Sequence, residues 1–210
     1  MNKTYLFDFD GTLVDSMPTF ARVMLQILDE YKISYSDDVI KVVTPLGYLG
    51  TADYFISLGL PMERDKLVKL MNDRIKFEYE NTILAKEGVE QTLIKMKELG
   101  CSLNVLTASP HLLLDPCLKR IGIFDLFDNV WSCDDFNTSK ADPNIYIRVA
   151  ERLNKKVGEV NFVDDNINAV KTSIKAGMVG IGIYDKSGED FAHEFKTIAD
   201  NYVYNFKELL

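Results

Sequence analysis

The first apolar stretch of the chain is short and carries acidic residues. Residues 5–9 are mostly apolar and aromatic, and Gly11 follows closely. A run of this length that is bounded by a glycine is typical of a buried strand followed by a tight turn. Because side chains alternate between the faces of a strand, Asp8 and Asp10 are expected on the same side. Two carboxylates at the end of a buried strand repel each other, so this pattern favours a cation or a shared proton between them.

A helical pattern follows and continues to about residue 85. Ser16 and Pro18 are typical of a helix start. Apolar residues then recur at helical spacing in two stretches, Phe20, Val23, Met24, Ile27, Leu28 and Tyr31 in the first and Leu67, Leu70, Met71, Ile75 and Phe77 in the second. Since no strand pattern interrupts this region, residues 16–85 are predicted to form a small helical domain.

From residue 88 onward, short apolar runs alternate with helical stretches. Strands are predicted over residues 102–106, 129–132, 160–163, 179–184 and 202–203. Such alternation predicts an α/β fold whose parallel sheet is covered by helices on both faces. The first strand belongs to this sheet, because it has no other partner. Residues 1–15 and 86–210 are therefore expected to form one core, with residues 16–85 inserted after its first strand.

Composition and charge exclude several classes of function. The formal net charge of -8 argues against a surface that binds nucleic acid or an anionic membrane. We find no run of roughly 18 apolar residues and no apolar signal-peptide core, so neither a membrane span nor export is expected. Three cysteines, Cys101, Cys117 and Cys133, lack metal-ligand spacing and fit free thiols. We predict a cytoplasmic protein, and the pattern favours no particular oligomeric state.

Candidate chemistry lies at the predicted carboxyl ends of the strands, where open parallel sheets bind ligands. The polar residues at these ends are Asp8 and Asp10, then Thr107 and Ser109, and finally Asp164 and Asp165, with Lys140 ahead of a predicted helix. Individually, the hydroxyls and carboxylates could cap helices, and the lysine could be a solvated surface charge. Together, two acidic clusters, a hydroxyl and a lysine form a set that is suited to phosphoryl transfer.

These residues give the chain a resemblance to the haloacid-dehalogenase-like hydrolase superfamily, and within it to the phosphoglycolate-phosphatase-like and β-phosphoglucomutase-like group. Residues 8–16 resemble the first family motif, Thr107 the second, Lys140 the third and residues 164–165 the fourth. The resemblance covers essentially the whole chain. It implies a Rossmann-like parallel sheet, with residues 16–85 as a mobile helical cap that opens and closes over the Asp8 edge.

The resemblance also implies a role for each motif residue. Asp8 would attack phosphorus and form an aspartyl-phosphate, while Asp10 would first protonate the leaving alkoxide and then deprotonate the attacking water. Thr107, Ala108 and Lys140 would bind the transferring phosphate. An anionic nucleophile needs cations around a phosphate dianion before it can approach.

Mg²⁺ is the implied cofactor, in keeping with its preference for few carboxylates and several waters. The resemblance implies that the Asp8 carboxylate, the Asp10 backbone carbonyl and Asp165 hold the ion. Ala169 stands where many family members carry another acidic residue, so the site depends on Asp164 and Asp165. We expect Asp165 to bind the metal directly and Asp164 to act beside it or through water.

The expected reaction is hydrolysis of a small phosphorylated metabolite, a phosphate monoester. Asp10 favours it, because dehalogenases and phosphonoacetaldehyde hydrolases of this superfamily lack an aspartate there. Two alternatives stay open. One is a sugar-phosphate mutase of the β-phosphoglucomutase kind, whose basic cap motif is not recognisable in residues 41–52, and the other is a non-catalytic binding protein with the same fold. Candidate substrate-facing residues of the cap are Arg22, Lys41, Thr44, Tyr48, Tyr54 and Arg74.

Overall fold

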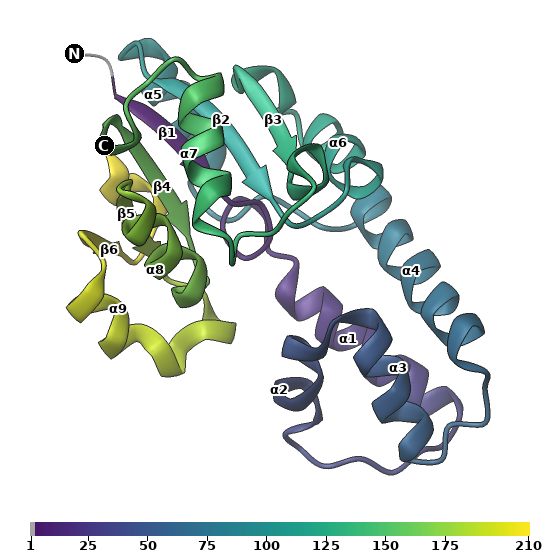
Figure 1. The fold of residues 1–210 in the computed structure, drawn as a ribbon. Coiled ribbons are helices and arrows are strands. Elements are labelled where there is room, and N and C mark those ends of the chain that lie inside the picture. The colour runs from purple at the N-terminus through teal and green to yellow at the C-terminus, as the bar shows by residue number, and fades with distance from the viewer. Residues whose placement is uncertain (1–2) are drawn as a thin grey trace. The chain divides into compact units, whose positions relative to one another are not determined.

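The computed structural model describes residues 3–210, apart from the side chain at position 45. The chain divides into two compact units, one made of residues 16–83 and the other of the two flanking stretches. Among the described residues of the second unit, six strands form one sheet in the order β3-β2-β1-β4-β5-β6, and every neighbouring pair is parallel (Figure 1). The predicted α/β class with a parallel sheet is confirmed.

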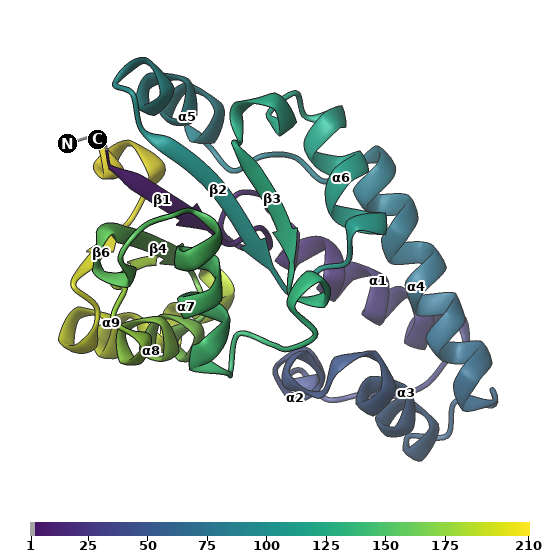
Figure 2. The same ribbon diagram turned by 45° about the horizontal axis from the view of Figure 1, so that its top comes forward.

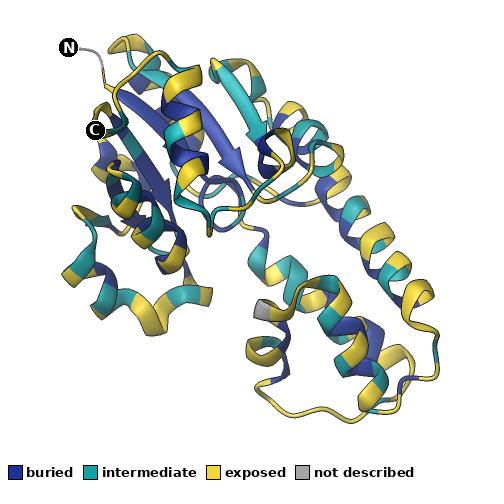
Figure 3. Ribbon diagram, in the orientation of Figure 1, coloured by how far each residue is buried: buried dark blue, intermediate teal, exposed yellow. Residues whose placement is uncertain are grey.

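The strands lie where the apolar runs predicted them, within one or two residues at each end. Their bounds are β1 Thr4–Phe7, β2 Ser102–Thr107, β3 Asn129–Ser132, β4 Val160–Asp164, β5 Val179–Ile183 and β6 Asn201–Val203. In β1, Leu6 is opposite Asn104 of β2 and Phe162 of β4, so this strand is central (Figure 2). All four of its residues are buried, as its apolar composition requires (Figure 3).

Helices cover the two faces of the sheet. They are α5 Val89–Glu98, α6 His111–Arg120, α7 Pro143–Arg152, α8 Ile167–Ala176 and α9 Ala192–Ile198. On the face of α7 and α8, Leu6 packs in one cluster with Tyr146 and Phe162. On the opposite face, the ring of Phe7 stacks on that of Phe206, with centroids 5.7 Å apart. The alternation of side chains along β1 thus supplies apolar groups to two separate cores.

Glycines in β5 let helices approach the sheet closely. A Cβ atom at Gly180 would collide with Ile174 of α8, and one at Gly182 would collide with Phe195 of α9. The helix α9 was not predicted, because few of its positions are apolar. Its ring at Phe195 is nevertheless buried, since Gly182 leaves room for it.

The unit of residues 16–83 is helical throughout its regular structure. It contains α1 Met17–Glu30, α2 Val39–Val43, α3 Gly47–Ser57 and α4 Arg64–Asn81. Helix α4 packs on α1 and on α3. The residues buried along α1 are Val23, Met24, Ile27 and Leu28, which are members of its predicted apolar stripe. All four helices lie within the stretch that the sequence pattern marks as helical.

The two segments that connect this unit to the sheet are paired with each other. The backbone N–H of Asp15 donates to the carbonyl of Leu84 at 3.0 Å. Val14 forms an antiparallel bridge with Ala85. The chain therefore leaves the sheet-containing unit and returns to it at the same place.

Two predictions from composition can be compared with the structure. Cys101, Cys117 and Cys133 are free thiols, as their spacing indicated. Within residues 3–210, no helix combines the length and the apolar character that a membrane span requires.

Candidate active site

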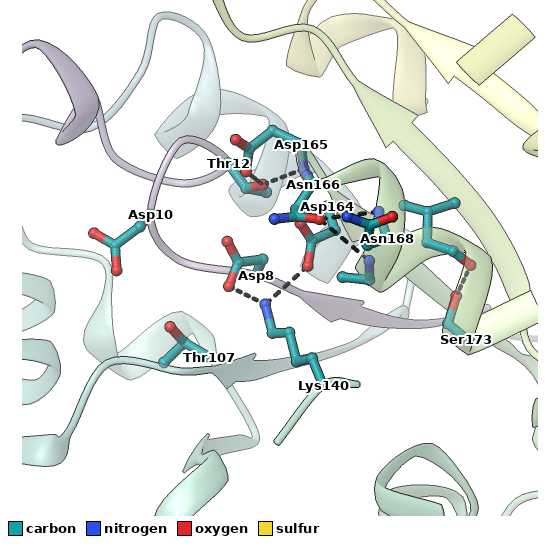
Figure 4. Close-up of polar contacts among 12 residues, drawn as sticks. Asp8, Asp10, Thr12, Thr107, Lys140, Asp164, Asp165, Asn166, Asn168 and Ser173 are labelled. Carbon is teal, nitrogen blue, oxygen red and sulfur yellow. Dashed lines mark hydrogen bonds and ion pairs between the residues drawn. The ribbon is translucent and has the colours of Figure 1, made fainter. Parts of the chain in front are cut away.

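Asp8 is fixed at the carboxyl end of the central strand. Strand β1 ends at Phe7, and the backbone N–H of Asp8 continues its ladder by donating to the carbonyl of Val163 at 2.9 Å. The carboxylate is buried and accepts a hydrogen bond from the ammonium of Lys140 (Figure 4). The central position of β1 thus places this carboxylate among the ends of β2, β1 and β4.

Lys140 reaches the same edge from the loop before α7. Its ammonium also donates to Oδ2 of Asp164 at 2.8 Å. The hydroxyl of Tyr146 donates to the carbonyl of Lys140 at 3.1 Å, which holds the lysine backbone against the first turn of α7. Burial disfavours the charged lysine, but the carboxylates of Asp164 and Asp8 outweigh it and hold the pKa of Lys140 above its ordinary value. Lys140 is therefore positively charged in this environment.

Asp164 and Asp165 follow one another at the end of β4 but have different partners. Asp164 is fully buried, and its Oδ1 accepts a hydrogen bond from the backbone N–H of Asn166 at 2.7 Å. Oδ1 of Asp165 accepts one from the hydroxyl of Thr12 at 3.1 Å, and the backbone N–H of Asp165 donates to the same hydroxyl. A Cβ atom at Gly11 would collide with the Asp165 carboxylate. The turn after β1 therefore shapes the position of Asp165.

Three carboxylates meet at this edge with one cation beside them. One oxygen from each of Asp8, Asp164 and Asp165 lies within 4.8 Å of the others. Burial raises the pKa of Asp8 to about 7, with Asp164 and Asp10 adding to the rise and Lys140 opposing it. Burial, followed by the charges of Asp164 and Asp8, also raises the pKa of Asp165 well above its ordinary value.

A divalent cation is the natural complement of this cluster. It would offset both the burial of the carboxylates and their mutual repulsion. Oxygen ligands from few carboxylates also suit Mg²⁺. The residues that are present therefore fit the metal that the family resemblance implies.

Asp10 lies in the turn beyond the strand, because β1 is shorter than predicted and ends at Phe7. The alternation rule does not extend to it. Gly11 has a φ of 74°, which turns the chain sharply after Asp10. Oδ2 of Asp10 accepts a hydrogen bond from the hydroxyl of Ser109 at 2.5 Å. In Figure 4 the Asp10 carboxylate lies apart from the linked group of Asp8, Lys140 and Asp164.

The end of β2 carries the remaining predicted residues. The hydroxyl of Thr107 is buried and accepts a hydrogen bond from the backbone N–H of Ser109 at 3.0 Å. Ala108, between them, is exposed. The sequence also allowed Ser109 to cap the following helix, but α6 is preceded by Pro110 and has no side-chain cap hydrogen bond, and the Ser109 hydroxyl contacts Asp10 instead. Its position directly after a strand end is the signal that could have suggested this contact.

Two of the candidate substrate-facing residues of the helical unit have carboxylate partners within that unit. Arg22 pairs with Glu78 at 2.8 Å, and Arg74 forms two hydrogen bonds with Glu30, of 2.9 and 2.5 Å. Ion pairs of this kind orient the guanidinium groups. The hydroxyl of Thr44 donates to the carbonyl of Ile40 at 2.7 Å, as is usual for a threonine at the end of a helix.

Comparisons with known proteins find phosphatases of similar sequence. Over 193 residues the chain is 28% identical to a phosphoglycolate phosphatase of Psychrobacter arcticus, covering 87% of this chain and 84% of that protein. Over 177 residues it is 24% identical to a phosphorylated carbohydrates phosphatase of Thermotoga maritima, covering 84% and 82%. Both matches extend over most of each protein.

A solved structure shares the fold. It is a HAD family hydrolase of Deinococcus radiodurans with bound phosphate and sodium, which superposes with a TM-score of 0.81 at 19% identity and covers 99% of this chain and 93% of that one. The family model described as haloacid dehalogenase-like hydrolase matches residues 2–177. The chain therefore belongs to the haloacid dehalogenase-like hydrolase family.

Proposed function

We propose that this protein is a Mg²⁺-dependent phosphatase that hydrolyses a small phosphate monoester through an aspartyl-phosphate on Asp8. The observation that carries the proposal is the group of Asp8, Lys140, Asp164 and Asp165 at the carboxyl edge of the sheet, in which Asp8 and Asp164 are buried. A surplus of carboxylates around one lysine suits a site that takes up a metal cation before it accepts an anionic substrate. The names of both curated relatives, which are phosphatases, support the same reaction class.

In the first step, a carboxylate oxygen of Asp8 attacks phosphorus, and the bond between phosphorus and the ester oxygen breaks. Asp10 donates its proton to that leaving oxygen, so the product is a neutral alcohol. The hydroxyl of Ser109 contacts one Asp10 oxygen, at 2.5 Å, and orients the carboxyl group. The ammonium of Lys140, with Thr107 and the backbone N–H of Ala108, binds the equatorial oxygens of the phosphoryl group.

In the second step, Asp10 is ionised and takes a proton from water. The water oxygen attacks phosphorus, and the bond between phosphorus and Asp8 breaks, which releases phosphate and regenerates the carboxylate. The same residue thus serves as acid and then as base. Its position in the turn, outside the carboxylate cluster, is consistent with a group that handles protons rather than holding a metal by its side chain.

Mg²⁺ would be held by the carboxylates of Asp8 and Asp165 together with the backbone carbonyl of Asp10, with Asp164 beside them or acting through water. When bound, it supplies positive charge that offsets the repulsion between the Asp8 carboxylate and the substrate phosphate. The hydrogen bonds from Thr12 to Asp165 and from Asn166 to Asp164 orient these two carboxylates.

We assign the choice of substrate to the unit of residues 16–83, which would act as the cap. The fold by itself does not specify a substrate. The two relatives differ in their named substrates, phosphoglycolate in one and phosphorylated carbohydrates in the other. A small phosphorylated metabolite is therefore the proposed class.

The test is phosphate release from a panel of small phosphate monoesters, with Mg²⁺ and with EDTA. Asp8→Asn is the decisive variant, and Asp128→Asn, at the opposite end of the strands, is its matched control. We expect Mg²⁺-dependent release that Asp8→Asn abolishes and Asp128→Asn retains. Release that survives Asp8→Asn would refute the mechanism. Conversion of one sugar phosphate into its isomer without free phosphate, followed by NMR, would replace hydrolysis by a mutase reaction.

A further inference from the structure

Lys86 is a half-buried residue that contacts the turn carrying the proposed catalytic residues. It lies just before α5, where the chain returns from residues 16–83. Its ammonium donates to the carbonyl of Gly11 at 2.7 Å, to the carbonyl of Tyr184 at 2.9 Å and to Oδ2 of Asp185 at 2.9 Å. An ammonium has three N–H groups, and these three acceptors use all of them. This lysine is therefore held in one position.

Asp185 is a rigid partner for this lysine. Its side chain is only 6% exposed. Its other oxygen, Oδ1, accepts hydrogen bonds from the backbone N–H of Ser187 at 2.8 Å and from the Ser187 hydroxyl at 2.5 Å. With both oxygens engaged, the carboxylate fixes the ammonium of Lys86 beside the end of β5. The Gly11 carbonyl is in this way connected to the sheet through a short chain of charge-assisted hydrogen bonds.

The turn itself depends on a few backbone contacts. The N–H of Gly11 donates to the carbonyl of Val14 at 3.0 Å, and the N–H of Lys86 donates to the carbonyl of Leu13 at 3.0 Å. Lys86 thus holds the turn by its backbone and by its side chain. Gly11 stands between Asp10, the proposed acid and base, and Thr12, which contacts Asp165. The carbonyl that Lys86 binds belongs to the peptide between Gly11 and Thr12, so its release would let the conformation of the turn change at Gly11, and the direction of the Asp10 side chain would change with it.

We propose that Lys86 is a positioning residue for the reaction. By fixing the Gly11 carbonyl, and with it the conformation of the turn, it sets the direction in which Asp10 presents its carboxyl group to the leaving oxygen. This inference rests on the phosphatase function proposed above. Sequence reasoning did not find Lys86, because two of its three acceptors are main-chain carbonyls. The alternative is that the Lys86–Asp185 pair only stabilises the fold, and the two roles predict different kinetics.

The variants are chosen to separate positioning from folding. Lys86→Met keeps the length of the side chain and removes its N–H groups. It leaves Asp185 without its cation, so the double variant Lys86→Met/Asp185→Asn removes that buried charge as well. Lys97→Met is the matched control, because the ammonium of Lys97 contacts Asp128 at 2.6 Å near the amino ends of the strands, away from the turn.

The kinetic measurement compares two leaving groups. An alkyl phosphate needs a proton from Asp10, whereas p-nitrophenyl phosphate releases a stable phenolate without one. We use kcat/KM, because it reports the step in which the leaving group departs. For both Lys86→Met and the double variant, we expect kcat/KM to fall by about 10²-fold with the alkyl ester and by about threefold or less with the aryl ester. Lys97→Met should leave both values unchanged. An equal fall with both esters, or no fall, would overturn the proposal.

A second measurement does not depend on activity. Amide hydrogen exchange over residues 9–15 should become at least about tenfold faster in the double variant, with α7 unchanged, because the turn opens locally. Unchanged exchange in the turn would also overturn the proposal. If the wild-type protein released no phosphate from either ester, the proposed function would fail. The exchange result would then still decide whether Lys86 holds the turn.

Discussion

Two half-buried lysines at the carboxyl edge of the sheet differ in the charges around them. Lys140 contacts Asp8 and Asp164, and Asp165 lies close to both. Lys86 faces one carboxylate, Asp185, and two carbonyls. The first group has an excess of negative charge, and the second is balanced.

The pKa values of the carboxylates follow this difference. Burial and the neighbouring carboxylates raise the pKa of Asp8 to about 7. Burial also disfavours the charged form of Asp185, but hydrogen bonds from Ser187 and Lys86 outweigh it and hold its pKa below the ordinary value. An unbalanced cluster is ready to accept a cation and an anionic substrate, whereas a balanced one holds parts of the fold together. Similar residues thus have a proposed catalytic role in one group and a proposed positioning role in the other.

The largest effect is expected from changing the unbalanced group. Asp8→Asn should lower turnover by at least about 10³-fold, because it removes the proposed nucleophile. It should not lower the free energy of unfolding, since a neutral amide relieves the repulsion from Asp164 and Asp165. Phosphate release and urea unfolding in EDTA measure the two quantities. A variant that is both active and less stable would show that Asp8 is a structural residue.

The balanced group should respond in the opposite way. Lys86→Met is expected to lower the free energy of unfolding by about 3 kcal/mol, because Asp185 is left buried without its cation. Since the pKa of Asp185 in the folded state lies below 3.8, the stabilisation is present above about pH 4 and is lost as the pH falls further. Urea unfolding at pH 7 and pH 3 tests this. The double variant with Asp185→Asn should recover part of the loss at pH 7, and no recovery would mean that the charge of Asp185 is unimportant.

The stabilisation by bound Mg²⁺ should be a smaller effect, and it should depend on the unbalanced group alone. At a concentration of 100 times its Kd, Mg²⁺ stabilises a protein by about 2.7 kcal/mol, which raises the Tm of a chain of this size by about 5–10 °C. We expect Asp165→Asn to abolish this increase and Asp185→Asn to preserve it. Thermal unfolding with Mg²⁺ and with EDTA gives the answer. A loss of the increase in both variants would mean that the balanced group also takes part in metal binding.

A third, more exposed group provides the smallest effect. Nδ1 of His111 lies 2.8 Å from Asp115, and Nε2 lies 2.9 Å from Asp135. Two hydrogen bonds raise the pKa of the His111 imidazole above 6.5, and the bond to Asp115 contributes more than the bond to Asp135. The resulting stabilisation is fully present below pH 6.5 and is lost as the pH rises through the higher folded-state pKa.

Solvent screens this exposed group, so His111→Gln should cost at most about 1 kcal/mol at pH 6 and nothing at pH 9. The urea midpoints of the variant and the wild-type protein at the two pH values test the expectation. A difference that is the same at both would assign the effect to packing instead of charge.

The sequence predicted the parts of the site that follow strand ends. Asp8, Thr107 and Asp164 lie at the carboxyl ends of β1, β2 and β4, and parallel strands bring such ends together. Asp10 behaves differently, because β1 ends at Phe7 and the turn then directs Asp10 toward Ser109. The alternation of side chains along a strand does not predict the direction of a side chain in the turn that follows.

Lys86 and α9 were missed for other physical reasons. Lys86 donates to the main-chain carbonyls of Gly11 and Tyr184. Because every residue has a carbonyl, no residue type in the sequence marks these contacts. Helix α9 buries Phe195 against a glycine of β5, and this space exists only once the sheet has formed. Contacts that depend on main-chain atoms or on a missing side chain leave no periodic signal in the sequence.

The pairing of the segments before and after residues 16–83 has a consequence for how such a chain can evolve. The N–H of Asp15 meets the carbonyl of Leu84 at 3.0 Å, so the two ends of the insertion are already joined. For the sheet, the inserted unit is a closed loop, and the entropy of closing a loop rises only slowly with its length. A longer, shorter or unrelated unit at this point would change the folding free energy of the sheet little. A whole domain can therefore be exchanged at this paired junction without rebuilding the sheet.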